Sequence, residues 1–142
     1  MSFIRNFFKS AVEKRALTIL KKYQAAEVLF LEENSSYPAI ITSYSLIKLQ
    51  SNYQVIIHQN NLLNRSSKER SFEMDKQSYE AIDKKITQYF GELEADSRMA
   101  KDGVTYYFVT ANVDASKYVA VRNPDKETIA GNLIAEIKFL NQ

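Results

Sequence analysis

The sequence predicts an α+β fold in which a single antiparallel sheet is flanked by helices, with the element order α-β-β-(β)-α-β-β-α. Three observations lead to this prediction. The length of 142 residues is right for one domain, spanning residues 1–142. Two stretches rich in β-branched and aromatic residues, at about 39–59 and 104–122, are each divided by a short turn, as in antiparallel hairpins. Segments with helical spacing of apolar residues stand before, between and after them, so we expect helices on one face of the sheet.

The first segment, from Ser2 to about Glu33, has no glycine or proline and is rich in helix-forming residues, so we expect it to be helical. Its apolar residues fall in two stripes, which centre near ~30° and ~130° on a helical wheel. One straight helix cannot bury both stripes against one surface. Either the helix breaks near residues 12–16, or residues 1–15 form a basic amphipathic helix that packs separately from the domain core.

The first sheet-forming stretch follows the turn residues Asn34 to Pro38. Its residue types predict two strands joined by a tight turn, at about 39–50 and 53–59. The polar residues from Asn60 to Arg70 predict a loop, and a short third strand follows at 71–74.

The second half of the chain begins with a one-sided apolar stripe from Tyr79 to Leu93, which predicts a helix capped by Asp75. Two strands are predicted next, at 104–111 and 117–122.

The last helix is predicted from a start signal and an apolar stripe. Asn123 can cap it, and Pro124 suits its first position. We expect Leu133 and Ile137 on its buried side.

The composition excludes many classes of enzyme. The chain has no cysteine, one histidine and three glycines. It therefore lacks disulfides, thiolate metal sites, cysteine nucleophiles and glycine-rich phosphate loops. His58 has no second imidazole to form a metal site or a relay, so we interpret it as an ordinary strand residue. We expect no cofactor, no metal and no catalytic residue.

The charge distribution is uneven, because residues 1–24 contain six basic residues and one acid while the whole chain carries +2. This basic end does not extend into a broad nucleic-acid face. The strand near Tyr106 is aromatic, like the RNA-binding strand of RRM domains, but Asp102 stands where that pattern has a cation. Strand alternation also directs Tyr106 and Phe108 together into the core. We therefore expect no nucleic-acid partner.

An aromatic N-terminal surface is the strongest candidate for binding. It is flanked by Arg5 and Lys9, and an apolar face of this size usually marks an interface. The domain itself, a partner chain or weak contact with a membrane surface could cover it. Its residues are Phe3, Ile4, Phe7 and Phe8.

A second candidate is the predicted polar loop. Arg65, Lys68 and Arg70 carry donors suited to a phosphate or a carboxylate, so they form a candidate anion-binding loop.

Together these features favour a non-catalytic protein-interaction domain that uses the N-terminal helix and a sheet face. We expect another protein chain as partner, in a homo-oligomer such as a dimer or in a hetero-complex. The element order is similar to that of small secretion chaperones and some toxin-neutralising immunity proteins, which also implies protein binding. The alternative is a small ligand-binding domain or enzyme with Tyr, Arg and carboxylate groups in a sheet–helix cleft. No membrane span or secretory signal is visible, so we expect a cytoplasmic protein.

Overall fold

The computed structural model describes residues 10–35, 39–95, 104–122 and 127–140. Three helices and six strands lie in these ranges. In chain order they are α2 (Ala11–Lys22), β1 (Glu27–Ser35), β2 (Ile40–Lys48), β3 (Tyr53–Asn61), β4 (Ser66–Met74), α3 (Lys76–Ala95), β5 (Val104–Asn112), β6 (Ser116–Arg122) and α4 (Ile129–Phe139).

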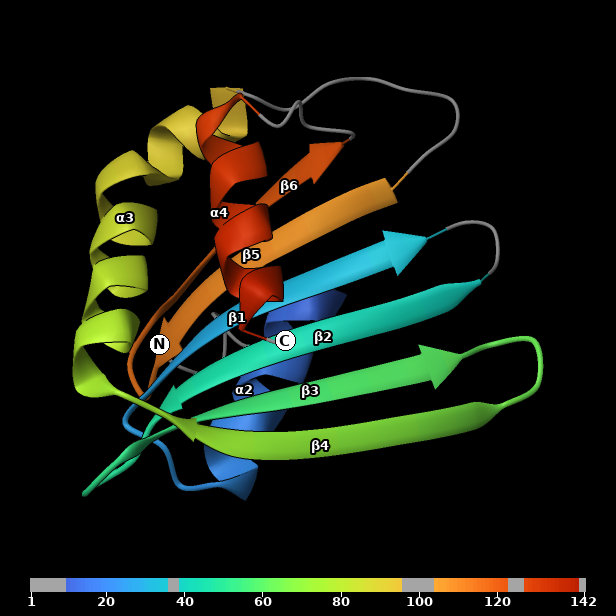
Figure 1. The fold of residues 1–142 in the computed structure, drawn as a ribbon, viewed down its shortest axis with the longest axis horizontal. Helices are drawn as coiled ribbons and strands as arrows, with labels where there is room; N and C mark the ends of the chain where they lie inside the picture. Colours follow the sequence, from blue (N-terminus) through green and yellow to red (C-terminus); the bar gives the residue numbers. More distant parts are fainter. Residues whose placement is uncertain (1–9, 36–38, 96–103, 123–126, 141–142) are drawn as a thin grey trace.

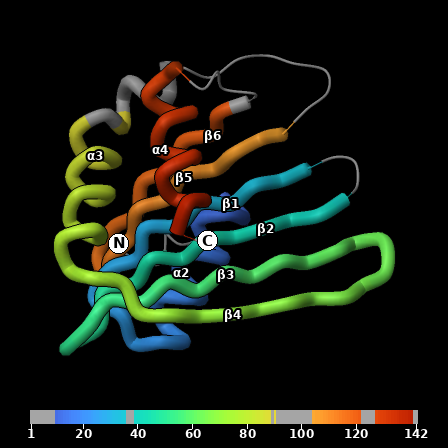
Figure 2. Tube along the Cα trace, in the orientation of Figure 1, coloured from blue at the N-terminus to red at the C-terminus, as the bar shows by residue number. Residues whose placement is uncertain are grey.

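The six strands form one antiparallel sheet in the order β4-β3-β2-β1-β5-β6, which confirms the α+β class. Helices α3 and α4 lie in front of the sheet and α2 lies behind it (Figure 1). The expectation that the helices share one face is therefore wrong. The chain trace shows β4 at one edge, with the β3–β4 hairpin projecting beyond the other strand ends (Figure 2).

The central strand β1 occupies residues that the sequence analysis assigned to a helix. Val28 to Leu31 are all buried, because α3 and α4 cover one face of β1 and α2 covers the other. A strand buried on both faces shows a continuous apolar run instead of alternation, and such a run cannot be distinguished from a buried helix by its periodicity. The long predicted helix is thus a helix followed by a strand.

Helix α2 has defined ends that separate it from its neighbours. Ser10 is extended and caps it, since the Ser10 hydroxyl accepts from Glu13 N–H and the Glu13 carboxylate accepts from Ser10 N–H, both at 3.2 Å. At the other end, Gln24 has a φ of 51° and turns the chain toward β1. The break expected near residues 12–16 is absent, because α2 runs through these residues and begins after Ser10. Residues 11–15 belong to this helix and pack on the sheet, so the expected separate helix over 1–15 is wrong for them.

The predicted loop from Asn60 to Arg70 is mostly strand. The side chain of Asn61 accepts from the backbone N–H groups of Leu63 and Asn64, which closes a short turn, and β4 then starts at Ser66. From Ser66 to Arg70 this edge strand has polar residues on both faces, so this part lacks the apolar alternation that predicts a strand. The short strand predicted at 71–74 forms the end of β4, where Phe72 and Met74 pack against the core.

The helices α3 and α4 supply much of the core on their side of the sheet. Asp75 caps α3 as predicted, accepting from Ser78 N–H at 2.9 Å. The last helix starts later than predicted, at Ile129, because the Thr128 side chain caps it by accepting from Gly131 N–H; Asn123 and Pro124 lie outside the described residues. The core positions of Leu133 and Ile137 are confirmed. Tyr106 and Phe108 also pack together on this side, as alternation predicted.

None of the helices within the described ranges is long and apolar enough to cross a membrane.

Candidate functional site

The predicted N-terminal surface falls outside the described residues, because Phe3, Ile4, Phe7 and Phe8 precede Ser10. The place where that segment joins the domain is clear. Glu13, in the first turn of α2, accepts a 2.6 Å hydrogen bond from Ser116 Oγ at the start of β6. The chain that carries the four apolar residues therefore enters the domain beside β6.

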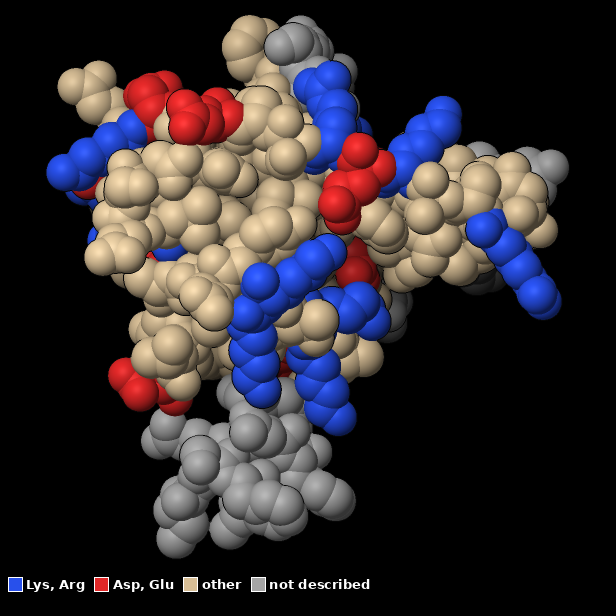
Figure 3. Space-filling view, turned by 90° about the horizontal axis from the view of Figure 1, so that it is seen from below, with Lys and Arg blue, Asp and Glu red and all other residues tan. Residues whose placement is uncertain are grey.

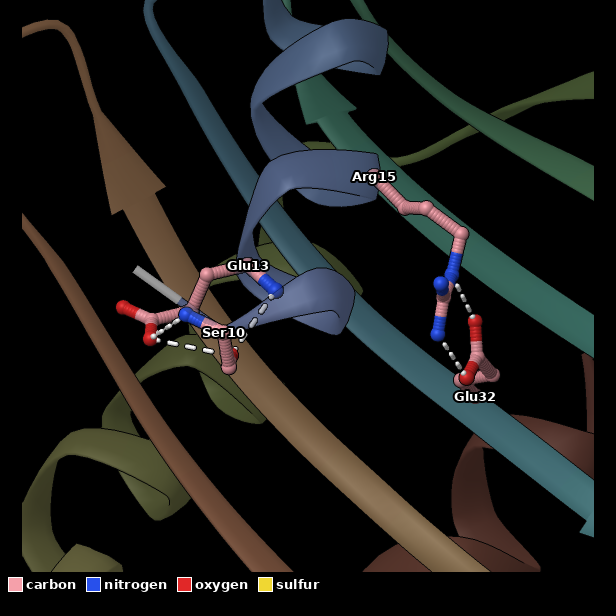
Figure 4. Close-up of polar contacts among 4 residues, drawn as sticks. All are labelled: Ser10, Glu13, Arg15 and Glu32. Atoms are coloured by element: carbon pink, nitrogen blue, oxygen red, sulfur yellow. Dashed lines mark hydrogen bonds and ion pairs between the residues drawn. The ribbon is translucent and has the colours of Figure 1, made fainter. Parts of the chain in front are cut away.

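Helix α2 is held on the sheet by an ion pair with two hydrogen bonds. Arg15 donates from Nε and Nη2 to the two carboxylate oxygens of Glu32 on β1, at 2.7 and 2.6 Å (Figure 4). The Glu32 side chain is 1% exposed and the Arg15 side chain 50% exposed. The hydrogen bond to Glu32 raises the pKa of Arg15, so the guanidinium stays charged at neutral pH.

The outer face of α2 is basic. Lys14, Lys21 and Lys22 are exposed, whereas the acid of this helix, Glu13, is turned toward Ser10 and Ser116. Viewed from the β4 side, lysine and arginine side chains gather over α2 and on the projecting β3–β4 hairpin (Figure 3). This helix therefore presents a positively charged surface to solvent.

The predicted anion-binding residues lie on that hairpin. Arg65 occupies its turn with a φ of 57°, and Lys68 and Arg70 follow on one face of β4. All three are exposed, and the Arg70 guanidinium lies 5.3 Å from the centre of the Phe72 ring. They form an exposed cationic strip and not the closed loop that the sequence suggested.

His58 lies on β3, directly opposite Ser43 of β2 and Glu69 of β4. A hydroxyl, an imidazole and a carboxylate therefore stand in one row on one face of the sheet, and these are the three groups of an acyl-transfer triad. Acyl transfer also needs free N–H donors for an oxyanion, but β2 and β3 are interior strands whose backbone groups pair with their neighbours. The row is consistent with an ordinary polar sheet face.

A cleft of about 140 Å³ lies between α3 and the ends of β1, β5 and β6. Two of its lining residues are the acids Glu27 and Asp83, and Tyr79 donates a 2.7 Å hydrogen bond to Glu27. Burial and the charge of Glu27 raise the pKa of Asp83, and burial raises the pKa of Tyr79. Neither Arg65 nor His58 lines this cleft. No cluster of three or more metal-binding side chains occurs in the described part of the chain.

The two edges of the sheet differ in charge. In β6 the charges stand toward the ends, at Lys117 and Arg122, and the residues from Tyr118 to Val121 are uncharged. Charged side chains protect an edge from pairing with another strand, so β6 lacks at its centre the protection that β4 has. The charged residues of β4 are Lys68, Glu69, Arg70 and Glu73.

The backbone at the centre of β6 points outward. Asn112 N–H donates to Ala115 O at 2.9 Å, which makes these two residues a hydrogen-bonded pair at the β5–β6 turn. Hydrogen-bonded pairs alternate along an antiparallel ladder, so Val119 bonds to β5 whereas Tyr118 and Ala120 direct their N–H and C=O groups away from it. Within the described residues, β6 pairs with β5 alone.

Exposed apolar side chains accompany these backbone groups. Tyr118 is 40% exposed, and its ring is stacked on that of Tyr107 with centroids 6.1 Å apart. Val113, in the adjoining turn, is 78% exposed. We use the term β6 edge for the outward backbone of Tyr118 and Ala120 together with these three side chains. The sequence alone does not reveal the β6 edge, because an uncharged run marks a sheet edge only once the strand order is known.

Comparisons of the chain with protein-family models, curated proteins and solved structures give no match.

Proposed function

We propose that this chain is a non-catalytic protein-interaction domain that binds another polypeptide along the β6 edge. The observation that carries the proposal is the contrast between the charged β4 and the uncharged centre of β6. An extended segment added to a sheet edge gains affinity from backbone hydrogen bonds and specificity from neighbouring side chains. Tyr118 and Ala120 would supply the backbone groups, and the rings of Tyr107 and Tyr118 would supply apolar contact area.

The N-terminal surface belongs to the same proposal. The residues Phe3, Ile4, Phe7 and Phe8 are joined to the domain at Ser10, whose helix contacts Ser116 of β6 through Glu13. A partner bound at the β6 edge would therefore be close to the point where this segment joins the domain. The basic residues Lys14, Lys21 and Lys22 favour a partner with acidic side chains. We also propose a cytoplasmic location, since a chain with no cysteine draws no stability from an oxidising compartment.

Two proline substitutions test the edge. Ala120→Pro removes an N–H that points away from β5, so the β5–β6 ladder keeps its bonds. Ser71→Pro is the matched control on β4. The bond from Leu62 N–H to Ala39 O means that the even-numbered residues of β3 bond to β2 and the odd-numbered ones bond to β4. Ser71 lies opposite the even-numbered Ile56, so its N–H points away from β3.

The measurement is the amount of each protein that co-purifies with the tagged chain from its host cells, determined by mass spectrometry. We expect Ala120→Pro to reduce partner recovery about tenfold or more and Ser71→Pro to leave it unchanged. Equal recovery with both variants would contradict binding at the β6 edge.

A truncation tests the N-terminal surface. Deleting residues 1–9 keeps the Ser10 cap and the buried Val12, so the melting temperature should change little. We expect weaker partner recovery from the truncated chain. A much lower melting temperature with unchanged recovery would show that residues 1–9 serve the domain's own core.

The alternative function, a ligand-binding domain or enzyme with a sheet–helix cleft, has less support. The cleft beside Glu27 and Asp83 contains a carboxylate pair and lies next to Tyr79, but it contains neither Arg65 nor His58.

A further inference from the structure

We infer that the β6 edge binds a second copy of this chain, so that two six-stranded sheets join into one continuous antiparallel sheet. This inference rests on the proposed function and identifies the partner strand as β6 of the other copy. The twofold axis would run perpendicular to the sheet, midway between the two Val119 residues, which lie opposite each other in the paired β6 strands. A closed twofold contact of this kind uses the same surface on both copies.

The charge pattern of β6 suits pairing with itself. About Val119, every residue of the strand has a partner: Tyr118 lies opposite Ala120 of the other copy, Lys117 opposite Val121 and Ser116 opposite Arg122. No like charges stand opposite each other in this register. The outward backbone groups of Tyr118 and Ala120 are those that meet across the junction.

The same operation on β4 brings like charges together in each central register. Centred on Arg70, the strand opposes Arg70 with itself. Moving the centre to Ser71 opposes Glu69 with Glu73, and moving it to Glu69 opposes Lys68 with Arg70. Like charges directly opposite each other destabilise a strand pair. Self-association should therefore use β6 and not β4, although both strands are sheet edges.

The aromatic side chains extend the contact across the axis. In the register centred on Val119, the two Tyr118 residues are diagonal neighbours, with Cα atoms roughly 7–8 Å apart, a separation that aromatic rings can bridge. Each Tyr118 ring is already stacked on Tyr107 at an interplanar angle of 14°. The four rings would form one cluster on the α2 side of the joined sheet.

The strand is already fixed before the second copy arrives. Val119 and Val121 are buried in the core below α3 and α4, so β6 keeps its conformation without a partner. Binding then needs little ordering of this strand, and that lowers the entropic cost of association.

The test is the mass of the purified full-length chain, measured by sedimentation equilibrium over a range of concentrations. We expect twice the 16.4 kDa chain mass at high concentration and a reversible return to the single-chain mass on dilution. Ala120→Pro should weaken self-association about tenfold or more, and Ser71→Pro should leave it unchanged.

A second pair of variants keeps the test decisive if Ala120→Pro fails to fold. Tyr118→Lys combined with Ala120→Lys places ammonium groups opposite each other across the junction, so this variant should be monomeric. Tyr118→Lys combined with Ala120→Glu places opposite charges there and should self-associate. Equal association of these two double variants, or a wild-type chain that stays at 16.4 kDa throughout, would overturn the second-copy inference. If the wild type is monomeric, and Ala120→Pro loses the host partner whereas Ser71→Pro keeps it, the proposed function stands and only the second-copy inference fails. If Ala120→Pro also retains the host partner, both fail.

Discussion

The ion pair between Arg15 and Glu32 gives the sharpest stability prediction. Arg15→Met removes the partner of a carboxylate whose side chain is 1% exposed, while the aliphatic part of the side chain is kept. Breaking a buried ion pair from one side costs about 3–5 kcal/mol, because the remaining charge is left without compensation. Arg15 is half exposed, so water can partly replace it, and we expect a loss of roughly 2–4 kcal/mol.

Two further variants separate the lost pair from the lost helix charge. Lys14→Met removes an exposed charge from the neighbouring position of α2 and should change the stability by less than about 0.5 kcal/mol. Glu32→Gln should cost less than Arg15→Met, since the half-exposed guanidinium can turn to solvent. The double variant Arg15→Met with Glu32→Gln should therefore be more stable than Arg15→Met alone.

The assay is urea unfolding followed by circular dichroism, which monitors the whole sheet. If Arg15→Met were no more destabilising than Lys14→Met, Glu32 would be adequately solvated without Arg15. In that case the ion pair could not be the anchor that holds α2 over β1.

The remaining expectations concern the core, the cleft and the histidine. Leu133→Ala should lose about 2–5 kcal/mol in urea unfolding, whereas Phe139→Ala, at a position 67% exposed on the same helix, should stay within about 0.5 kcal/mol. Asp83 has a raised pKa, so the folded state loses stability as pH rises through that value; Asp83→Asn should be more stable than wild type at neutral pH, and this advantage should shrink toward about pH 4. Thermal melts showing a less stable Asp83→Asn protein at neutral pH would contradict this. His58→Gln should leave both stability and partner recovery unchanged, and lost recovery in a folded variant would give His58 a function.

The elements that the sequence predicted well are those with one buried face. The stripe of α3 and the alternation of β5 each leave a regular pattern, because solvent and core select different residues on opposite faces. A capping residue in the sequence also predicted the start of α3, where Asp75 accepts from Ser78 N–H. The predicted start of the last helix was too early, because the side chain of Thr128 provides the cap that starts α4.

The elements that the sequence missed have two similar faces. Strand β1 is apolar on both sides from Val28 to Leu31, since it lies between α2 and the α3–α4 layer. Strand β4 is polar on both sides from Ser66 to Arg70. Neither of these two stretches shows the alternation of a half-buried strand. The candidate site was missed for a related reason. Tyr118 to Val121 become an unprotected edge only through a strand order that depends on long-range pairing.

A disulfide cross-link can test the β6 junction directly, because the chain has no cysteine of its own. With the axis at Val119, the two Val119 residues form a non-hydrogen-bonded pair with Cα atoms about 4.5 Å apart, inside the range that a disulfide spans. The two Ala120 residues are diagonal neighbours at roughly 7–8 Å and lie outside it. Under mild oxidation, Val119→Cys should yield a covalent dimer, and Ala120→Cys should remain a single chain. Failure of Val119→Cys to cross-link, or equally fast cross-linking of Ala120→Cys, would contradict the pairing of β6 with itself about Val119.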